Sequence, residues 1–236
     1  MTFTTKNNQA VPIMGIEADT IVNESLFTDW VNAIDPSWTI HSIEIQSVDR
    51  IPSGRILFVK VKADIEHAEG RMPGMIVVIR DYAVAALTVL NCEGVKYTLL
   101  VDQPRVPVGA VISESVAGLI DDGDNPRAVI LRELEEEAHM VTRLGITESD
   151  VIPLADKPFY LSPGVINEAV YPFVVEADIT PEVLSEYHGI KRGLAEEHET
   201  ITVKIVPFAD ITQHCNCATT LAMLHLYDRY QAFRAN

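Results

Sequence analysis

The chain has 236 residues, and 34 Asp and Glu against 18 Lys and Arg give it a formal net charge of −16. So few cations are poorly suited to neutralising phosphates, which argues against nucleic acid and against an anionic membrane surface as partners. Because 47% of the residues are hydrophobic, the chain can bury a sizeable core, and its length fits one large domain or two small ones.

The first third of the chain predicts a small antiparallel β domain. Residues 1 to about 40 show little regular pattern apart from a short helix over 24–34. Alternating apolar residues then predict strands over 41–50 and 55–65, with a turn at 52–54 between them. Runs of β-branched residues continue over 75–91. A domain boundary is expected near residue 85, so that 1–85 and 86–236 form two domains.

The remainder of the chain predicts mixed helices and strands. A hairpin at 91–94 leads into a strand over 96–103, and further strands are expected over 159–161, 169–177 and 199–208. Helices are expected over 126–138, from Thr180-Pro181 onward, and over 219–233. The three cysteines show no disulfide spacing, and no signal or spanning segment stands out. A cytoplasmic protein with reduced thiols is therefore expected.

The segment from Gly118 to Met140 carries the chemical signal, with the sequence GLIDDGDNPRAVILRELEEEAHM. On a helix that turns about 100° per residue, Glu133, Glu136 and Glu137 share one face. A separate apolar face is made by Ile130, Leu131, Leu134 and Ala138. Glu135 points away from both faces and is expected to be solvated.

Three carboxylates at positions i, i+3 and i+4 repel one another, and a bound cation would offset that repulsion. Hard oxygen ligands suit Mg²⁺ or Mn²⁺ better than Zn²⁺. Bound Mg²⁺ usually shares its coordination sphere with phosphate oxygens, so this helix implies a phosphate-bearing substrate. The alternative is a solvated acidic helix face. The fixed spacing of Gly118, Asp124 and the Arg132-Glu133 pair argues against it.

That spacing resembles the signature of the Nudix hydrolase family: Gly, five residues, Glu, seven residues, then Arg-Glu-aliphatic-x-Glu-Glu-x-Gly. The chain departs from it twice, with Asp124 in place of Glu and His139 in place of Gly. Asp124 keeps a charge that can pair with Arg132. His139 stands where a left-handed residue ends the helix, a conformation that His adopts more readily than most non-glycine residues.

Motifs outside the signature are similar to the ADP-sugar branch of that family. They are Val101–Gly109, Glu114–Gly118, Tyr160–Gly164 followed by Glu168, and Gly193–Ile201. The resemblance implies an α/β (α+β) fold, a Nudix α/β/α sandwich with a mixed sheet, preceded by the small N-terminal β domain. It also implies a homodimer to which residues 1–85 contribute dimer contacts and part of the substrate site.

The activity that the resemblance implies is Mg²⁺-dependent hydrolysis of ADP-ribose or ADP-glucose to AMP and a sugar 1-phosphate, with Mn²⁺ as a possible substitute. One alternative is a hydrolase of GDP-mannose or another nucleoside diphosphate sugar. A second is a Nudix-fold sensor that binds a nucleotide sugar without cleaving it. The intact glutamate trio argues against the sensor.

The resemblance also assigns roles to single residues. The metal would be held by Glu133, Glu136 and Glu137 and by the carbonyl of Ala117. Glu197 would be the general base, with Glu196 and Glu199 as rivals, and Glu136 and Glu137 would share in catalysis. Substrate contacts are assigned to Arg105, Glu114, Ser162, Gly164 and Glu199. A surface ion pair remains the alternative for Arg105, and a plain turn for Ser162–Gly164.

Overall fold

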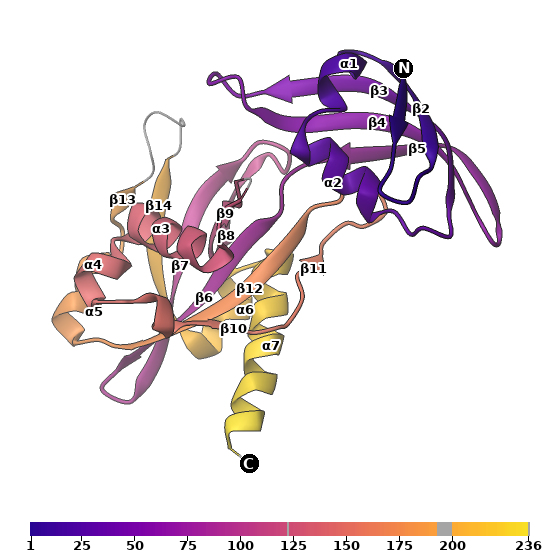
Figure 1. Ribbon diagram of the computed structural model, residues 1–236. Coiled ribbons are helices and arrows are strands. Elements are labelled where there is room, and N and C mark those ends of the chain that lie inside the picture. The colour runs from indigo at the N-terminus through magenta and orange to yellow at the C-terminus, as the bar shows by residue number, and fades with distance from the viewer. Residues whose placement is uncertain (122, 193–199, 236) are drawn as a thin grey trace. The chain divides into compact units, whose positions relative to one another are not determined.

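The computed structural model describes residues 1–121, 123–192 and 200–235 (Figure 1). The chain forms two compact units, one of residues 1–82 with 162–168 and one of residues 83–161 with 169–236. The first unit thus ends three residues before the expected boundary and includes a later segment that the sequence pattern did not indicate. None of the helices in the described ranges is long and apolar enough to cross a membrane.

The first unit is built on a five-stranded sheet in the order β1-β2-β3-β4-β5. Its strands are β1 (Thr2–Thr4), β2 (Ala10–Gly15), β3 (Thr39–Arg50), β4 (Ile56–His67) and β5 (Gly70–Ile79), with helices α1 (Ala18–Ile21) and α2 (Ser25–Ala33). The expectation of a wholly antiparallel unit is wrong, because β2 pairs with β3 in parallel. The irregular N-terminus is also corrected, because it contains β1, β2 and α1, of which β1 and α1 span only three and four residues.

One face of this sheet forms the core of the first unit. Ile43 and Ile45 of β3 and Val59 and Val61 of β4 point to the same side, because alternate strand residues share a face. Phe27 of α2 is fully buried against them. The predicted helix over 24–34 is therefore confirmed as the element that covers this face.

The second unit is built on a nine-stranded sheet with the central order β10-β12-β6-β7-β14-β13. The strands are β6 (Ala83–Cys92), β7 (Val95–Arg105), β8 (Ala110–Glu114), β9 (Val116–Leu119), β10 (Val151–Pro153), β11 (Phe159–Tyr160), β12 (Ala169–Asp178), β13 (Lys191–Arg192) and β14 (Ile201–Pro207). β12 pairs with β6 in parallel, whereas the other pairs are antiparallel. The expected mixed sheet is confirmed.

Helices cover both faces of this sheet (Figure 1). One face carries α3 (Pro126–Ala138), α4 (Met140–Leu144) and α5 (Pro181–Tyr187), and the other carries α6 (Ile211–His214) and α7 (Ala218–Arg234). The short turns η1 (Glu148–Asp150) and η3 (Phe208–Asp210) complete the described helices. The predicted sandwich is confirmed.

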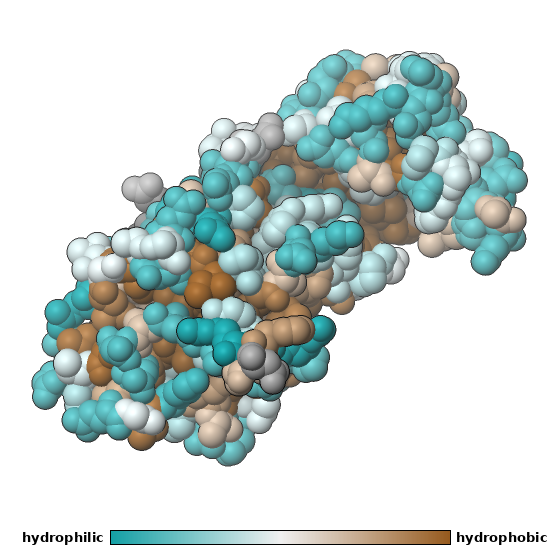
Figure 2. Space-filling model, turned by 60° about the horizontal axis from the view of Figure 1, so that its bottom comes forward, coloured by the Kyte–Doolittle hydropathy of each residue, from teal (hydrophilic) through white to brown (hydrophobic). Residues whose placement is uncertain are grey.

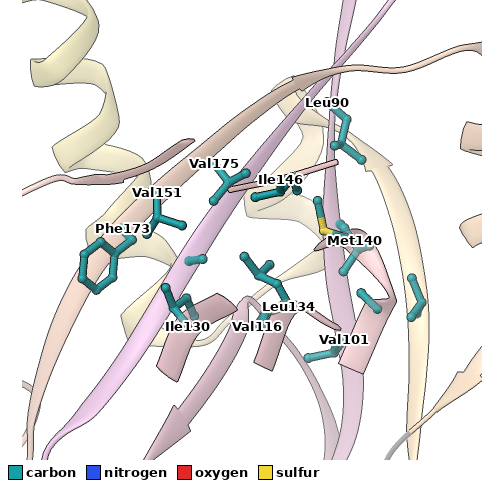
Figure 3. Close-up of a cluster of buried hydrophobic side chains, with 14 of the residues drawn as sticks. Leu90, Val101, Val116, Ile130, Leu134, Met140, Ile146, Val151, Phe173 and Val175 are labelled. Carbon is teal, nitrogen blue, oxygen red and sulfur yellow. The ribbon is translucent and has the colours of Figure 1, made fainter. Parts of the chain in front are cut away.

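The alternation of β6 explains how both faces are buried. Val84 and Ala86 pack with Leu134 of α3 in the cluster that Figure 3 shows, whereas Ala85 and Leu87 pack with the α7 side. A strand that is apolar on both sides belongs at the centre of a sheet. On the outer surface that Figure 2 shows, hydrophilic residues cover most of the area and apolar residues form patches.

Candidate active site

The helix that carries the glutamates begins and ends where the sequence predicts. The Asn125 side chain accepts a hydrogen bond from the Arg127 amide at 2.9 Å, and Pro126 occupies the first turn of α3. The helix ends at His139, whose φ of 51° is left-handed. Its amide donates to the Glu135 carbonyl at 2.8 Å, which satisfies an otherwise unpaired carbonyl of the last turn.

The apolar face of α3 fixes its rotation over the sheet. Val129, Ile130, Leu134 and Ala138 are buried, so Val129 takes the place that the sequence pattern assigned to Leu131, which is half-buried. Glu137 lies between these positions on the helix and is only 5% exposed. A carboxylate buried to this extent is costly unless nearby charges or donors compensate for it.

Glu133 lies directly against the backbone of Gly118 in β9. A Cβ atom at Gly118 would lie 2.2 Å from Oε1 and 2.3 Å from Cδ of Glu133, far inside any allowed contact. Gly118 pairs with Val84 of β6, whose side chain points to the α3 side of the sheet. Because Gly118 has no side chain, the carboxylate of Glu133 can pack against the backbone of β9.

Arg132 joins the preceding loop to the helix. Its Nη1 atom lies 3.4 Å from Oδ2 of Asp124, and its Nη2 atom lies 3.8 Å from Oε1 of Glu133. The predicted pair between Arg132 and Asp124 is confirmed, so the shorter acid still serves. Both side chains are about 40% exposed, and the pair therefore positions the loop more than it stabilises the fold.

The chemistry of the donor set fits a hard divalent cation, since Glu133, Glu136 and Glu137 offer carboxylate oxygens from one helix. Glu133 and Glu136 are half-buried and Glu137 is buried. Within the described ranges, no three or more His, Cys, Asp or Glu side chains are grouped closely enough to hold a metal ion. Binding a cation would thus require these side chains to converge further.

Glu135 points away from the buried face of α3, and its side chain is 32% exposed, but it is also bound to the next helix. Its carboxylate accepts hydrogen bonds from the amide and the hydroxyl of Thr142 at 2.9 and 2.7 Å. Burial disfavours its charge, but the bonds from Thr142 outweigh burial and hold the pKa of Glu135 below its ordinary value. Glu135 therefore links α3 to α4. In the sequence, the one sign of this link is Thr142, seven residues after Glu135.

The structure brings Arg105 and Glu114 together across the β7–β8 hairpin. Arg105 donates from Nε to Oε1 and from Nη2 to Oε2 of Glu114, at 2.8 and 3.0 Å. Glu114 stands opposite Val101, which belongs to the core on the α3 side, so it shares that side of the sheet with Gly118. An ion pair is the alternative role that the sequence indicates for Arg105, and this ion pair is present with Glu114.

The remaining candidates belong to three different parts of the chain. Ser162 and Gly164 belong to the first unit, where the Ser162 carbonyl accepts hydrogen bonds from the amides of Val165 and Ile166, both at 3.1 Å. The three acids proposed for the general base, Glu196, Glu197 and Glu199, fall outside the described residues. Ala117 is placed in β9 beside Gly118.

The fold and the glutamate helix define a class of enzyme, and comparison with known proteins identifies it. Residues 79–224 match the family model of the NUDIX domain. The chain is 31% identical over 229 residues to Nudix hydrolase 14, chloroplastic, of Arabidopsis thaliana, a match that spans 89% of this chain and 72% of that protein. The chain therefore belongs to the Nudix hydrolase family.

Two further similarities are to another relative and to a solved structure. The chain is 34% identical over 128 residues to the ADP-ribose pyrophosphatase of Bacillus subtilis (strain 168), over 54% of this chain and 63% of that protein. A solved structure described as an ADP compounds hydrolase matches with a TM-score of 0.55 at 18% identity, covering 84% of this chain and 96% of the other. At that identity the structural match shows a shared fold.

Proposed function

We propose that this Nudix hydrolase cleaves the diphosphate bond of ADP-ribose or ADP-glucose, with Mg²⁺, to give AMP and a sugar 1-phosphate. The observation that carries the proposal is the glutamate face of α3, anchored by the contact between Glu133 and Gly118. The ADP-ribose pyrophosphatase of Bacillus subtilis among its relatives supports the choice of substrate.

In this proposal Glu133, Glu136 and Glu137, with the carbonyl of Ala117, hold the metal, and Mn²⁺ can replace Mg²⁺. A bound divalent ion supplies neutralisation of the diphosphate and a more acidic water. Glu197 takes the proton from the attacking water, and Glu196 and Glu199 are its rivals for that role.

Substrate binding is assigned to the residues that the family resemblance indicates. Arg105, held by Glu114, offers a guanidinium to a phosphate or to the terminal sugar. Ser162, Gly164 and Glu199 complete the proposed contacts. The enzyme is expected to be cytoplasmic and to act as a homodimer. Sedimentation of the purified protein tests the dimer directly.

The substrate is tested by steady-state assays of the wild-type protein in Mg²⁺ against ADP-ribose, ADP-glucose, GDP-mannose and NADH, with each product separated and identified. The proposal expects the highest kcat/KM for an ADP-sugar, AMP as the nucleotide product, and loss of turnover when EDTA removes the metal. A preference for GDP-mannose would instead support the alternative substrate. Binding of ADP-ribose without turnover would support the sensor.

The site is tested by Glu137→Gln, which keeps the shape of the side chain and removes its charge. The loss of one metal carboxylate is expected to lower kcat by roughly 10³-fold. The rise in thermal midpoint that Mg²⁺ gives the wild type should also disappear, since ion binding stabilises the folded state. Asp228→Asn, an exposed change of the same charge on α7, is the control and should behave as wild type. Near-full Mg²⁺-dependent activity of Glu137→Gln would refute the assignment.

A further inference from the structure

Residues 162–168, here called the return segment, add to the end of β5 in the first unit. The Val78 amide donates to the Val165 carbonyl at 2.8 Å, and the Asn167 amide donates to the Val78 carbonyl at 3.2 Å. Val78 and Ile166 form a parallel bridge. The return segment is thus paired through its backbone to a strand more than eighty residues earlier in the chain.

Arg80 fastens the same segment with its backbone and its side chain. Its amide donates to Oδ1 of Asn167 at 2.8 Å, and its Nη1 atom lies 3.0 Å from Oε1 of Glu168. The guanidinium carbon lies 4.9 Å from the centre of the Phe58 ring, a cation–π contact. Both charged side chains are only 19% exposed, so water screens this pair far less than a surface ion pair.

The return segment has a fixed base and an exposed tip. Ile166, Asn167 and Glu168 are half-buried, whereas residues 162–165 are exposed. Gly164 at the tip has no left-handed φ, and a Cβ there would meet no atom within 4 Å. The fold itself therefore does not require glycine at this position. A residue without a side chain on an exposed turn permits close approach of a ligand to the backbone.

We propose that Arg80 is a positioning residue, which acts through Glu168 and Asn167 to hold the Ser162–Gly164 turn in the geometry that receives the nucleoside diphosphate sugar. The inference rests on the proposed function, because it takes Ser162 and Gly164 as substrate contacts. In this role Arg80 acts through its neighbours and not on the reacting atoms. A turn that is fixed in advance lowers the ordering cost of binding, so its release should affect KM more than kcat.

The test compares Arg80→Met with Arg80→Lys and with Arg71→Met. Arg71 lies at the start of β5, the strand that ends one residue before Arg80, and its 53% exposed side chain pairs with Asp64. Arg80→Met is expected to raise KM for ADP-ribose about tenfold, with kcat within about threefold of wild type, because a loosened contact weakens binding before it alters chemistry. Arg80→Lys keeps the charge beside Glu168 and should regain most of the loss, and Arg71→Met should match the wild type.

Amide hydrogen exchange gives a readout that does not depend on turnover. The amides of Val78, Arg80 and Asn167 are donors in this contact, and they should exchange faster in Arg80→Met than in the wild type and in Arg71→Met. Asn167→Ala, which removes one hydrogen bond and no charge, serves as the milder variant if Arg80→Met folds poorly. It should show the same changes at a smaller size.

The outcomes separate the two claims. Absence of turnover by the wild type on every nucleotide sugar would defeat the proposed function, and with it the role in substrate binding. Turnover by the wild type with an unchanged KM in Arg80→Met, or with a loss confined to kcat, would overturn the positioning role alone. Unchanged amide exchange would overturn it as well, because Arg80 would then not hold the segment.

Discussion

The two helices on opposite faces of the second sheet handle acidic residues in opposite ways. On the α7 side, Glu176 of β12 accepts hydrogen bonds from Tyr227 at 2.6 Å, Gln231 at 2.9 Å and Arg234 at 2.7 Å. All three donors come from α7, so one carboxylate fastens the last helix to the sheet. On the α3 side, the helix itself supplies Glu133, Glu136 and Glu137 and gathers them on one face.

The difference separates an acid that holds the fold from acids to which the proposed function assigns the metal. Glu176 sits in a ring of protein donors, which is how folded proteins stabilise a partly buried charge. Carboxylates three and four positions apart on one helix repel each other, and that arrangement costs stability unless a cation offsets the repulsion. The position of the acidic residues on α3 is therefore more informative about function than the net negative charge of the chain.

Among the changes that test this difference between the two helices, Gly118→Ala is expected to have the largest effect. The added methyl group would overlap the carboxylate of Glu133, so Glu133 must leave the β9 backbone. We expect kcat for an ADP-sugar to fall by about 10²-fold, because misplacement of a catalytic group by about 1 Å can cost that much. Steady-state kinetics in Mg²⁺ measure the effect, and circular dichroism checks that the fold persists.

A double-mutant comparison gives the control for Gly118→Ala. If the methyl group acts by moving Glu133, it should add little to the defect of Glu133→Gln. If the two losses in kcat instead combined fully in the double mutant, Gly118 would act independently of Glu133. The contact between Gly118 and Glu133 would then not explain the effect of Gly118→Ala.

A smaller effect is expected on the α7 side, from Glu176→Gln. This change removes the charge that Tyr227 and Arg234 bind, and we expect it to lower the free energy of unfolding by about 1–2 kcal/mol at pH 7, as for hydrogen bonds to a charged group. Turnover should stay near that of the wild type. Urea denaturation measures the loss. Glu186→Gln, whose side chain is 56% exposed and pairs with Arg143, should change stability little.

The effect of Glu176→Gln should also depend on pH. Burial disfavours the charge of Glu176, but the bonds from Tyr227 and Arg234 outweigh burial and lower its pKa. A lowered pKa stabilises the fold fully above the pKa of the unfolded chain, about 4.3, and this stabilisation is lost as the pH falls through the lower folded value. The difference between Glu176→Gln and the wild type should therefore shrink below about pH 4. A difference that stayed constant down to acid pH would contradict this.

Local features of the fold could be predicted from the sequence, whereas non-local ones could not. The bounds of α3, its cap at Asn125 and its left-handed end at His139 depend on residues within a few positions of each other. The parallel pairing of β2 with β3 and the return of residues 162–168 to the first unit depend on distant partners. The spacing of apolar residues within one segment does not indicate which distant segment it pairs with.

The same division holds for the candidate site. The shared face of Glu133, Glu136 and Glu137 and the pair of Arg132 with Asp124 follow from helix geometry and a short loop. The position of Gly118 against Glu133 depends on which strand lies under α3. The bond between Arg80 and Glu168 depends on two chain segments that meet only in the folded first unit. Sequence alone names such residues without giving their partners.

The smallest expected effect concerns the residue that ends α3. His139 adopts φ 51°, which costs a non-glycine residue roughly 1 kcal/mol, and its Nδ1 atom lies 3.0 Å from the Glu135 carbonyl, which offsets part of that cost. His139→Gly removes both the strain and the contact, so we expect a gain of less than about 1 kcal/mol in the free energy of unfolding. His139→Val, which is β-branched and poorly suited to positive φ, should be clearly destabilised. Urea denaturation separates the two variants, and a glycine variant less stable than the wild type would show that the side-chain contact outweighs the strain. Activity should be retained in His139→Gly, since the glutamates of α3 keep their places when the helix ends at the same residue.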